Sequence, residues 1–154
     1  MPNTSDNILL ISARFYGDIA DEMERGAKAA LAAAGLRHRL VHVPGALEIP
    51  AALHFALKAD EMRTGGRPAY DGYAALGCVI RGDTDHYEHV CQECMRGLSH
   101  AVVTYGVALG NGVLTVENFE QAWERAKVDQ QDKGGFAARA AVAMIALRRT
   151  LMAP

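Results

Sequence analysis

In Gly77-Cys-Val-Ile-Arg-Gly-Asp-Thr-Asp-His86-Tyr-Glu-His-Val90, an apolar strand gives way to a polar turn and then to a helix. The apolar run from Tyr73 to Ile80 predicts a buried strand that ends at Arg81-Gly82. A strand that stops at a glycine and opens a helix is a common anion site in α/β proteins, because helix N-terminal amides point at the ligand. His86 places a proton carrier beside that site. From these residues alone we expect an enzyme that acts on a small phosphorylated molecule.

Strand and helix patterns alternate along the whole chain. Apolar runs predict strands over 8–12, 37–43, 73–80 and 107–116, and amphipathic spacing predicts helices over 18–34, 48–59, 85–105, 117–126 and 136–151. Because parallel strands must be joined by right-handed crossovers, this order predicts a three-layer α/β/α sandwich with a four-stranded parallel sheet. We expect a flexible N-terminal arm, 1–7, followed by a single domain, 8–154.

Two details of this pattern concern element ends. Asn111 between two glycines is a hairpin signal, so a short hairpin competes with one kinked strand over 107–116. Asp18 is the expected cap of the first helix, and Gly35 is its expected stop.

The composition excludes several classes of function. The chain has 154 residues, half of them apolar, and a net charge of −2, which argues against broad binding of nucleic acids or anionic membranes. Its apolar runs are shorter than the ~20 residues of a membrane span, and its polar N-terminus has no signal-peptide core. Three cysteines without the spacing of a secreted framework indicate reduced thiols in a cytoplasmic protein.

Polar and aromatic side chains gather where the predicted strands end, which is the ligand-binding edge of a parallel sheet. They are Arg14, Phe15, Glu48, Arg81, Thr84 and His86. Some of these residues, and Asp83 beside them, also have an ordinary structural interpretation. His86 could be an exposed histidine, Phe15 a core residue and Asp83 a helix cap. The convergence of these residues is stronger evidence for a site than any one of them.

Metal and nucleotide cofactors find little support. Cys91-Gln-Glu-Cys94 has a zinc spacing, but no second C-x-x-C or histidine pair follows, and the segment has the pattern of a continuous helix. No GxGxxG or P-loop follows the first strand. We therefore expect neither a metal nor an organic cofactor.

Several motifs occur in a fixed order along the chain: Pro44-Gly-Ala-Leu-Glu-Ile-Pro50, Gly77-x-Val-Ile-Arg-Gly-x-Thr-x-His86-Tyr, Gly112-Val-Leu-Thr-Val-Glu117, Glu120-Gln-Ala-x-Glu-Arg125 and Lys133-Gly134. With them, the chain resembles the lumazine synthase family from about Ile8 to Leu147. The resemblance implies a flavodoxin-like fold and the penultimate step of riboflavin biosynthesis. In that step 5-amino-6-(D-ribitylamino)uracil condenses with 3,4-dihydroxy-2-butanone 4-phosphate and releases phosphate and water, without a cofactor.

The resemblance also implies roles for particular residues. His86 would be the acid–base residue, and Phe15 would stack on the pyrimidine ring. The implied substrate-binding residues are Phe15, Ala46, Leu47, Glu48, Val79, Ile80, Asn111 and Lys133. The implied phosphate-binding residues are Asp83, Thr84 and Arg125. Leu47 and Asn111 stand where other members often have aromatic residues.

The family forms homo-oligomers with sites between subunits, so the resemblance implies that Arg125 and Lys133 serve the pocket of an adjacent chain. Many shell-forming members have a glycine-containing kink between the last two helices, whereas 127–132 contains no glycine here. We therefore predict a pentamer, or two paired pentamers, and no megadalton shell. A non-catalytic carrier of a flavin-like ligand is the main alternative, and the combination of His86, Arg125 and Lys133 disfavours it. A zinc-stabilised scaffold is a third hypothesis.

Overall fold

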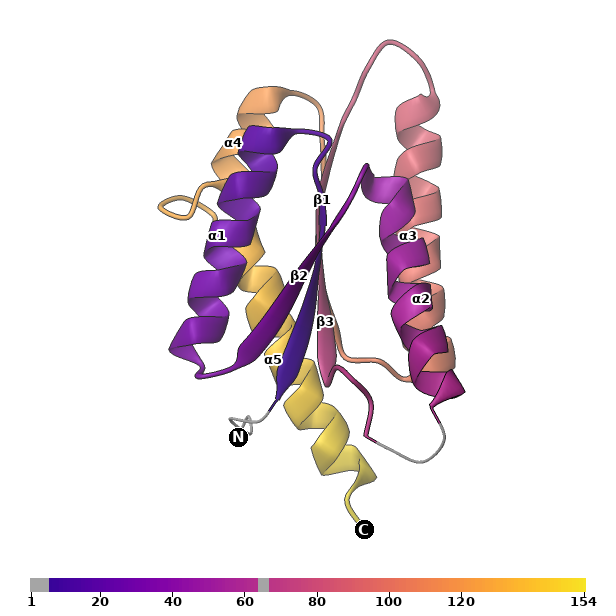
Figure 1. Ribbon diagram of the computed structural model, residues 1–154. Helices are drawn as coiled ribbons and strands as arrows, with labels where there is room; N and C mark the ends of the chain where they lie inside the picture. Colours follow the sequence, from indigo (N-terminus) through magenta and orange to yellow (C-terminus); the bar gives the residue numbers. More distant parts are fainter. Residues whose placement is uncertain (1–5, 64–66) are drawn as a thin grey trace.

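The protein is built as a parallel sheet between two layers of helices (Figure 1). The computed structural model describes residues 6–63 and 67–154. The strands are β1 (Asn7–Ala13), β2 (Arg37–Val43), β3 (Gly72–Ile80) and β4 (Leu109–Val116), in the sheet order β2-β1-β3-β4. Helices α1 (Gly17–Ala33), α4 (Phe119–Ala126) and α5 (Lys133–Met152) cover one face, and α2 (Ile49–Met62) and α3 (His86–Tyr105) cover the other. The predicted three-layer sandwich with a four-stranded parallel sheet is confirmed.

Both faces of the central strands are buried, as their uninterrupted apolar sequences predicted. Along β1, Ile8 and Leu10 join the core beneath α1 and α5, whereas Leu9 and Ile11 join the core beneath α2 and α3. Every residue of β3 except the last is buried. The sheet is therefore buried between the two helix layers, and the connections between elements lie at its two ends.

The segment around Asn111 is one strand, so the hairpin alternative is wrong. Leu109–Val116 pairs with Tyr73–Ile80 in parallel over its whole length, and neither flanking glycine has the positive φ that a two-residue hairpin requires. These glycines serve close packing instead. A Cβ on Gly110 would collide with the carbonyl oxygen of Ala137, so the glycine lets α5 lie directly on β4.

Two helices end at glycines, whereas α1 does not begin at the acidic residue that was expected to cap it. Gly35 (φ 69°) follows α1 and Gly106 (φ 63°) follows α3, both in the left-handed conformation that favours glycine. The expectation that Asp18 caps α1 is wrong, because the cap position is Tyr16 and Asp18 lies inside the first turn. Helix α5 begins at Lys133, earlier than predicted, because Asp132 caps it by accepting a hydrogen bond from the Gly135 amide at 3.1 Å.

The first described residues belong to the fold. Asp6 is fully buried and accepts two hydrogen bonds of 2.7 Å from the Arg149 guanidinium. Asn7 is the first residue of β1. Both were expected in a flexible N-terminal arm; the rest of that arm, residues 1–5, lies outside the described residues.

A candidate active site divided between two pockets

A pocket of about 400 Å³ lies where β1, β2 and β3 end, next to the N-terminus of α3. Backbone hydrogen bonds fix the loops around it, with the Arg14 amide donating to the Val43 carbonyl at 3.0 Å and the Glu48 amide to the Gly45 carbonyl at 3.1 Å. The predicted site residues that line it are Phe15, Ala46, Leu47, Glu48, Val79, Ile80, Thr84 and His86. The parallel sheet brings together side chains that come from three separate loops.

Phe15 forms an open aromatic edge of this pocket. Its side chain is 71% exposed, which rules out the core interpretation. The neighbouring Tyr16 ring packs edge-on against it, with the centroids 4.9 Å apart, and burial is the main cause that raises the pKa of Tyr16. An exposed ring held by a half-buried one offers a flat surface for a planar ligand.

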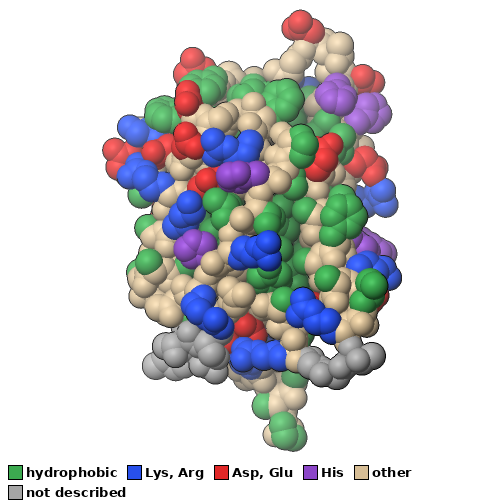
Figure 2. Space-filling model, viewed as in Figure 1, with side chains coloured by type: hydrophobic (Ala, Val, Ile, Leu, Met, Phe, Trp, Pro, Cys, Tyr) green, Lys and Arg blue, Asp and Glu red, His purple; other side chains and the backbone are tan. Residues whose placement is uncertain are grey.

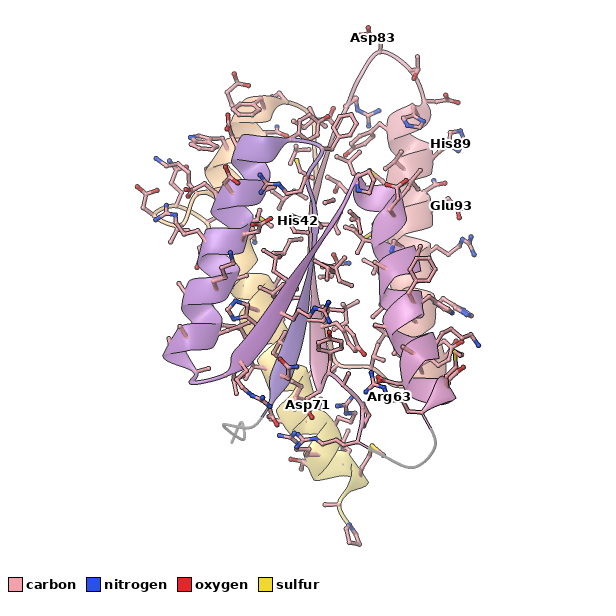
Figure 3. All side chains as sticks on the ribbon, viewed as in Figure 1. His42, Arg63, Asp71, Asp83, His89 and Glu93 are labelled. Atoms are coloured by element: carbon pink, nitrogen blue, oxygen red, sulfur yellow. The ribbon has the colours of Figure 1, made fainter. Side chains whose placement is uncertain are left out.

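The turn between β3 and α3 supplies the polar side of the pocket. The His86 amide donates a hydrogen bond to the Thr84 hydroxyl oxygen at 3.3 Å, so Thr84 helps to begin α3. Gly82, Thr84 and His86 line the pocket. Asp83 lies at the exposed tip of the turn (Figure 3) and is not among the described residues that line the pocket.

The remaining predicted residues line a second, smaller pocket. This hollow of about 260 Å³ lies along β4 and includes Asn111, Arg125, Lys133 and Phe136. The Arg125 guanidinium donates to the Gln121 carbonyl at 3.1 Å, and the Lys133 ammonium lies 5.2 Å from the Phe136 ring centroid. The two pockets share no lining residue, so one chain holds the predicted site as two separate halves.

Several lining residues were not singled out from the sequence: Tyr16, Pro44, Gly45, Cys78, Tyr87 and Val90. Tyr87 and Val90 lie three positions apart on α3, so helical spacing would have placed both on the pocket side. Cys78 gave no such signal, since a cysteine in an apolar strand looks like a core residue. Burial raises the pKa of its thiol to about 12, which keeps it protonated.

Two kinds of feature were searched for within residues 6–63 and 67–154. No group of three or more histidine, cysteine, aspartate or glutamate side chains is arranged to hold a metal ion in that part of the chain. Cys91 and Cys94 lie on one continuous helix, and burial raises the pKa of both thiols, which disfavours the thiolates that zinc requires. None of the described helices is long and apolar enough to cross a membrane.

The sequence profile of the 6,7-dimethyl-8-ribityllumazine synthases matches residues 6–149, a segment that contains both pockets. The chain belongs to the 6,7-dimethyl-8-ribityllumazine synthase family. A family member of this name from Afipia carboxidovorans is 53% identical over 151 residues, which cover 98% of this chain and 91% of the relative. 6,7-Dimethyl-8-ribityllumazine synthase 1 of Rhizobium meliloti is 56% identical over 94% of this chain and 93% of its own length. The synthase of Rhodopseudomonas palustris is 54% identical over 93% of this chain and 86% of its own.

Proposed function

We propose that this chain forms 6,7-dimethyl-8-ribityllumazine in riboflavin biosynthesis, from 5-amino-6-(D-ribitylamino)uracil and 3,4-dihydroxy-2-butanone 4-phosphate. The observation that carries the proposal is the pocket of this family member. It joins an exposed aromatic face, Phe15, to a helix N-terminus with Thr84 and His86. That combination suits a planar heterocycle lying beside a phosphorylated partner.

The apolar side of the pocket would hold the uracil substrate. Phe15 would stack on the pyrimidine ring, while the backbone groups of Val79 and Ile80 would bind its edge. Ala46 and Glu48 would hold the ribityl chain, because η1 (Ala46–Glu48) places them at the start of α2 beside the ring. Leu47, 43% exposed, would form an aliphatic wall.

The phosphate would bind at the β3–α3 turn with the Thr84 hydroxyl and the backbone of Asp83. Within the described residues 81–85, no cation of this turn is without a carboxylate partner. Asp83 and Asp85 are both acidic, and Arg81 is paired with Glu88 and Glu117. An anion therefore needs a positive charge from elsewhere.

Arg125 is the proposed source of that charge, and it comes from a neighbouring subunit. It lines a different pocket from Thr84 within one chain, together with Lys133 and Asn111. A ring of identical chains would close each site with the first pocket of one chain and the second pocket of the next. We propose a homopentamer, or two such rings paired, with active sites between subunits.

Catalysis would come from orientation and proton transfer. The pocket and the phosphate cradle would hold the two substrates together, which lowers the entropic part of the barrier. His86 would move protons during Schiff-base formation, phosphate elimination and ring closure. The proposed reaction needs no metal or organic cofactor. The free thiols Cys78, Cys91 and Cys94 support a reducing compartment, and we place the reaction in the cytoplasm.

The test is the growth of lumazine absorbance after both substrates are mixed with the purified protein. The expected result is a rate well above the spontaneous condensation and proportional to protein concentration. If the rate equals that of the spontaneous condensation while the protein still binds a flavin-like ligand, a carrier protein is favoured instead.

A further inference from the structure

Arg81 lies where β3, which contributes to the first pocket, and β4, which contributes to the second, both end. It directly follows β3, and its amide donates to the Val116 carbonyl at the end of β4, at 3.0 Å. Its side chain is not among the described residues that line either pocket. A role for Arg81 must therefore be sought in what its guanidinium holds.

The guanidinium is held from two sides by carboxylates. It donates to Glu88, in the first turn of α3, and its Nε donates to Glu117 at 2.7 Å. These bonds, that to Glu88 first, raise the pKa of Arg81. Because the negative charges of Glu88 and Glu117 both face the guanidinium, Arg81 adds little net positive potential to the β3–α3 turn.

The aromatic ring of Tyr87 is the third group that contacts the Arg81 guanidinium. The Arg81 guanidinium carbon lies 4.3 Å from the centroid of Tyr87, which lines the first pocket. Tyr87 lies in the first turn of α3, and burial is the main cause that raises its pKa. The contact between the guanidinium and this ring therefore joins the end of β3 to the first turn of α3. We call Arg81, Tyr87, Glu88 and Glu117 the Arg81 clamp.

The Arg81 clamp spans the phosphate turn on one side and α4 on the other. Residues 82–85 lie between Arg81 and the first turn of α3, so the bond to Glu88 closes this loop at its base. Glu117 directly precedes the α4 cap Asn118, and its amide donates to Gln121 at 2.8 Å. The Gln121 carbonyl in turn accepts from Arg125 at 3.1 Å. Hydrogen bonds therefore join Glu88 in α3, through Arg81 and Glu117, to the Gln121 side chain in α4, and the backbone carbonyl of the same Gln121 accepts from Arg125.

Resting on the proposed function, we infer that Arg81 is a positioning residue: it fixes the turn that receives the phosphate and, through Glu117, the helix that offers Arg125 to the next site. It does not bind the phosphate itself. A direct ligand would need its positive charge free, whereas a positioning residue works through the carboxylates that neutralise it.

Glu117→Ala separates these two roles. If Arg81 positions the turn, both Arg81→Ala and Glu117→Ala should raise KM for the phosphorylated ketone about five- to thirtyfold. KM for the uracil should stay within about twofold. If Arg81 were a phosphate ligand, Glu117→Ala would remove one of its two carboxylate partners, leave more of its charge for the phosphate and lower KM for the ketone. Lowered KM in Glu117→Ala, or equal effects on both substrates, would overturn the inference.

Two further variants guard against a general loss of structure. Arg81→Lys keeps the charge but loses the forked donors and the stacking, so it should fall between wild type and Arg81→Ala. Arg96→Ala removes another exposed arginine, which pairs with Glu93 on the outer side of α3. This variant should leave both KM values unchanged.

Inorganic phosphate gives a readout that does not depend on turnover. Titration calorimetry of the assembled protein should show phosphate affinity reduced by a similar factor in Arg81→Ala and Glu117→Ala. If the wild type makes no lumazine but phosphate binding still falls in both variants, the clamp stands and the proposed function fails. If the wild type is active and both variants bind phosphate normally, the clamp is wrong and the function stands.

Discussion

Arg125 lies in a polar hollow where its charge is only weakly engaged, 3.8 Å from Glu124. If it binds the substrate phosphate, Arg125→Ala should raise KM for the phosphorylated ketone about ten- to a hundredfold, because a charge-assisted hydrogen bond is lost. KM for the uracil should change much less. Lys58→Ala, which removes an exposed cation paired with Glu61 on α2, is the control. Steady-state kinetics with each substrate varied in turn measures both KM values. An equal effect on the two KM values would contradict the assignment of Arg125 to the phosphate.

The buried thiols predict how stability changes in alkali. Burial raises the pKa of Cys78 to about 12 and that of Cys94 to about 11, from 9.0. Below 9.0 both thiols are protonated in the folded and unfolded chains alike. Above it only the unfolded chain ionises, so stability falls as pH rises from about 9 toward 11–12. We expect each thiol to cost about 1 kcal/mol at about pH 10, measured by urea unfolding. Cys94→Ala should reduce this slope; an unchanged slope would contradict the burial argument.

Single residues also mark how far sequence reasoning reaches. His86 and Thr84, predicted at a strand end, line the first pocket, because a strand end followed by a helix fixes where their side chains start. Phe15 stayed ambiguous between core and ligand surface until its exposure was known. Arg81 was noted as polar, but its two carboxylate partners come from different elements, one of them 36 positions away. Spacing along the chain carries no such information.

At the scale of elements, β4 and α5 pack closely at Gly110. Gly110→Ala should reduce the free energy of unfolding by about 1–3 kcal/mol, because the new Cβ meets the Ala137 carbonyl and α5 must move. Gly17→Ala is the matched control, since its Cβ would meet only Arg14 Nη2 at 4.0 Å and the residue lies in a helix. That control should be neutral or slightly stabilising. Urea unfolding at one fixed protein concentration measures both; equal stabilities would contradict the packing argument.

The same region shows which element predictions were within reach. Apolar period and glycine stops identified all four strands and the alternation with helices, because those signals are local. The hairpin alternative at Gly110-Asn-Gly112 arose from local turn chemistry. It fails because β3 supplies a parallel partner and α5 requires glycine for close approach. Both reasons are tertiary and leave no local trace.

At the scale of the whole molecule, the mass of the particle in solution tests the predicted assembly. A pentamer should have a mass near 83 kDa, five times the 16.6 kDa of one chain, and a paired ring about twice that. The described residues include exposed aromatic side chains that such a ring could bury. Phe119 stacks on Trp123 in α4, and Phe55 on α2 lines a hollow along the edge strand β2. Figure 2 shows apolar side chains gathered between β2 and α2. Mass photometry checks the prediction; a megadalton particle would contradict it.

The proposed division of the site between chains makes a sharper prediction than the mass does. One variant carries Phe15→Ala and His86→Ala, in the first pocket, and another carries Arg125→Ala and Lys133→Ala, in the second. Each alone should assemble and be nearly inactive. When the two are unfolded, mixed in equal amounts and refolded together, about a quarter of the sites should receive both intact halves, because each half is intact in one chain of two.

The recovered activity should follow the mixing ratio, with its maximum at equal amounts. It should be absent when the two variants are refolded separately and then combined without exchange of subunits. If each site were complete within one chain, every chain in the mixture would carry a damaged site, and no ratio would restore activity. The recovery therefore distinguishes a shared site from an internal one by a rate assay alone, and it does so whether the assembly is one ring or two.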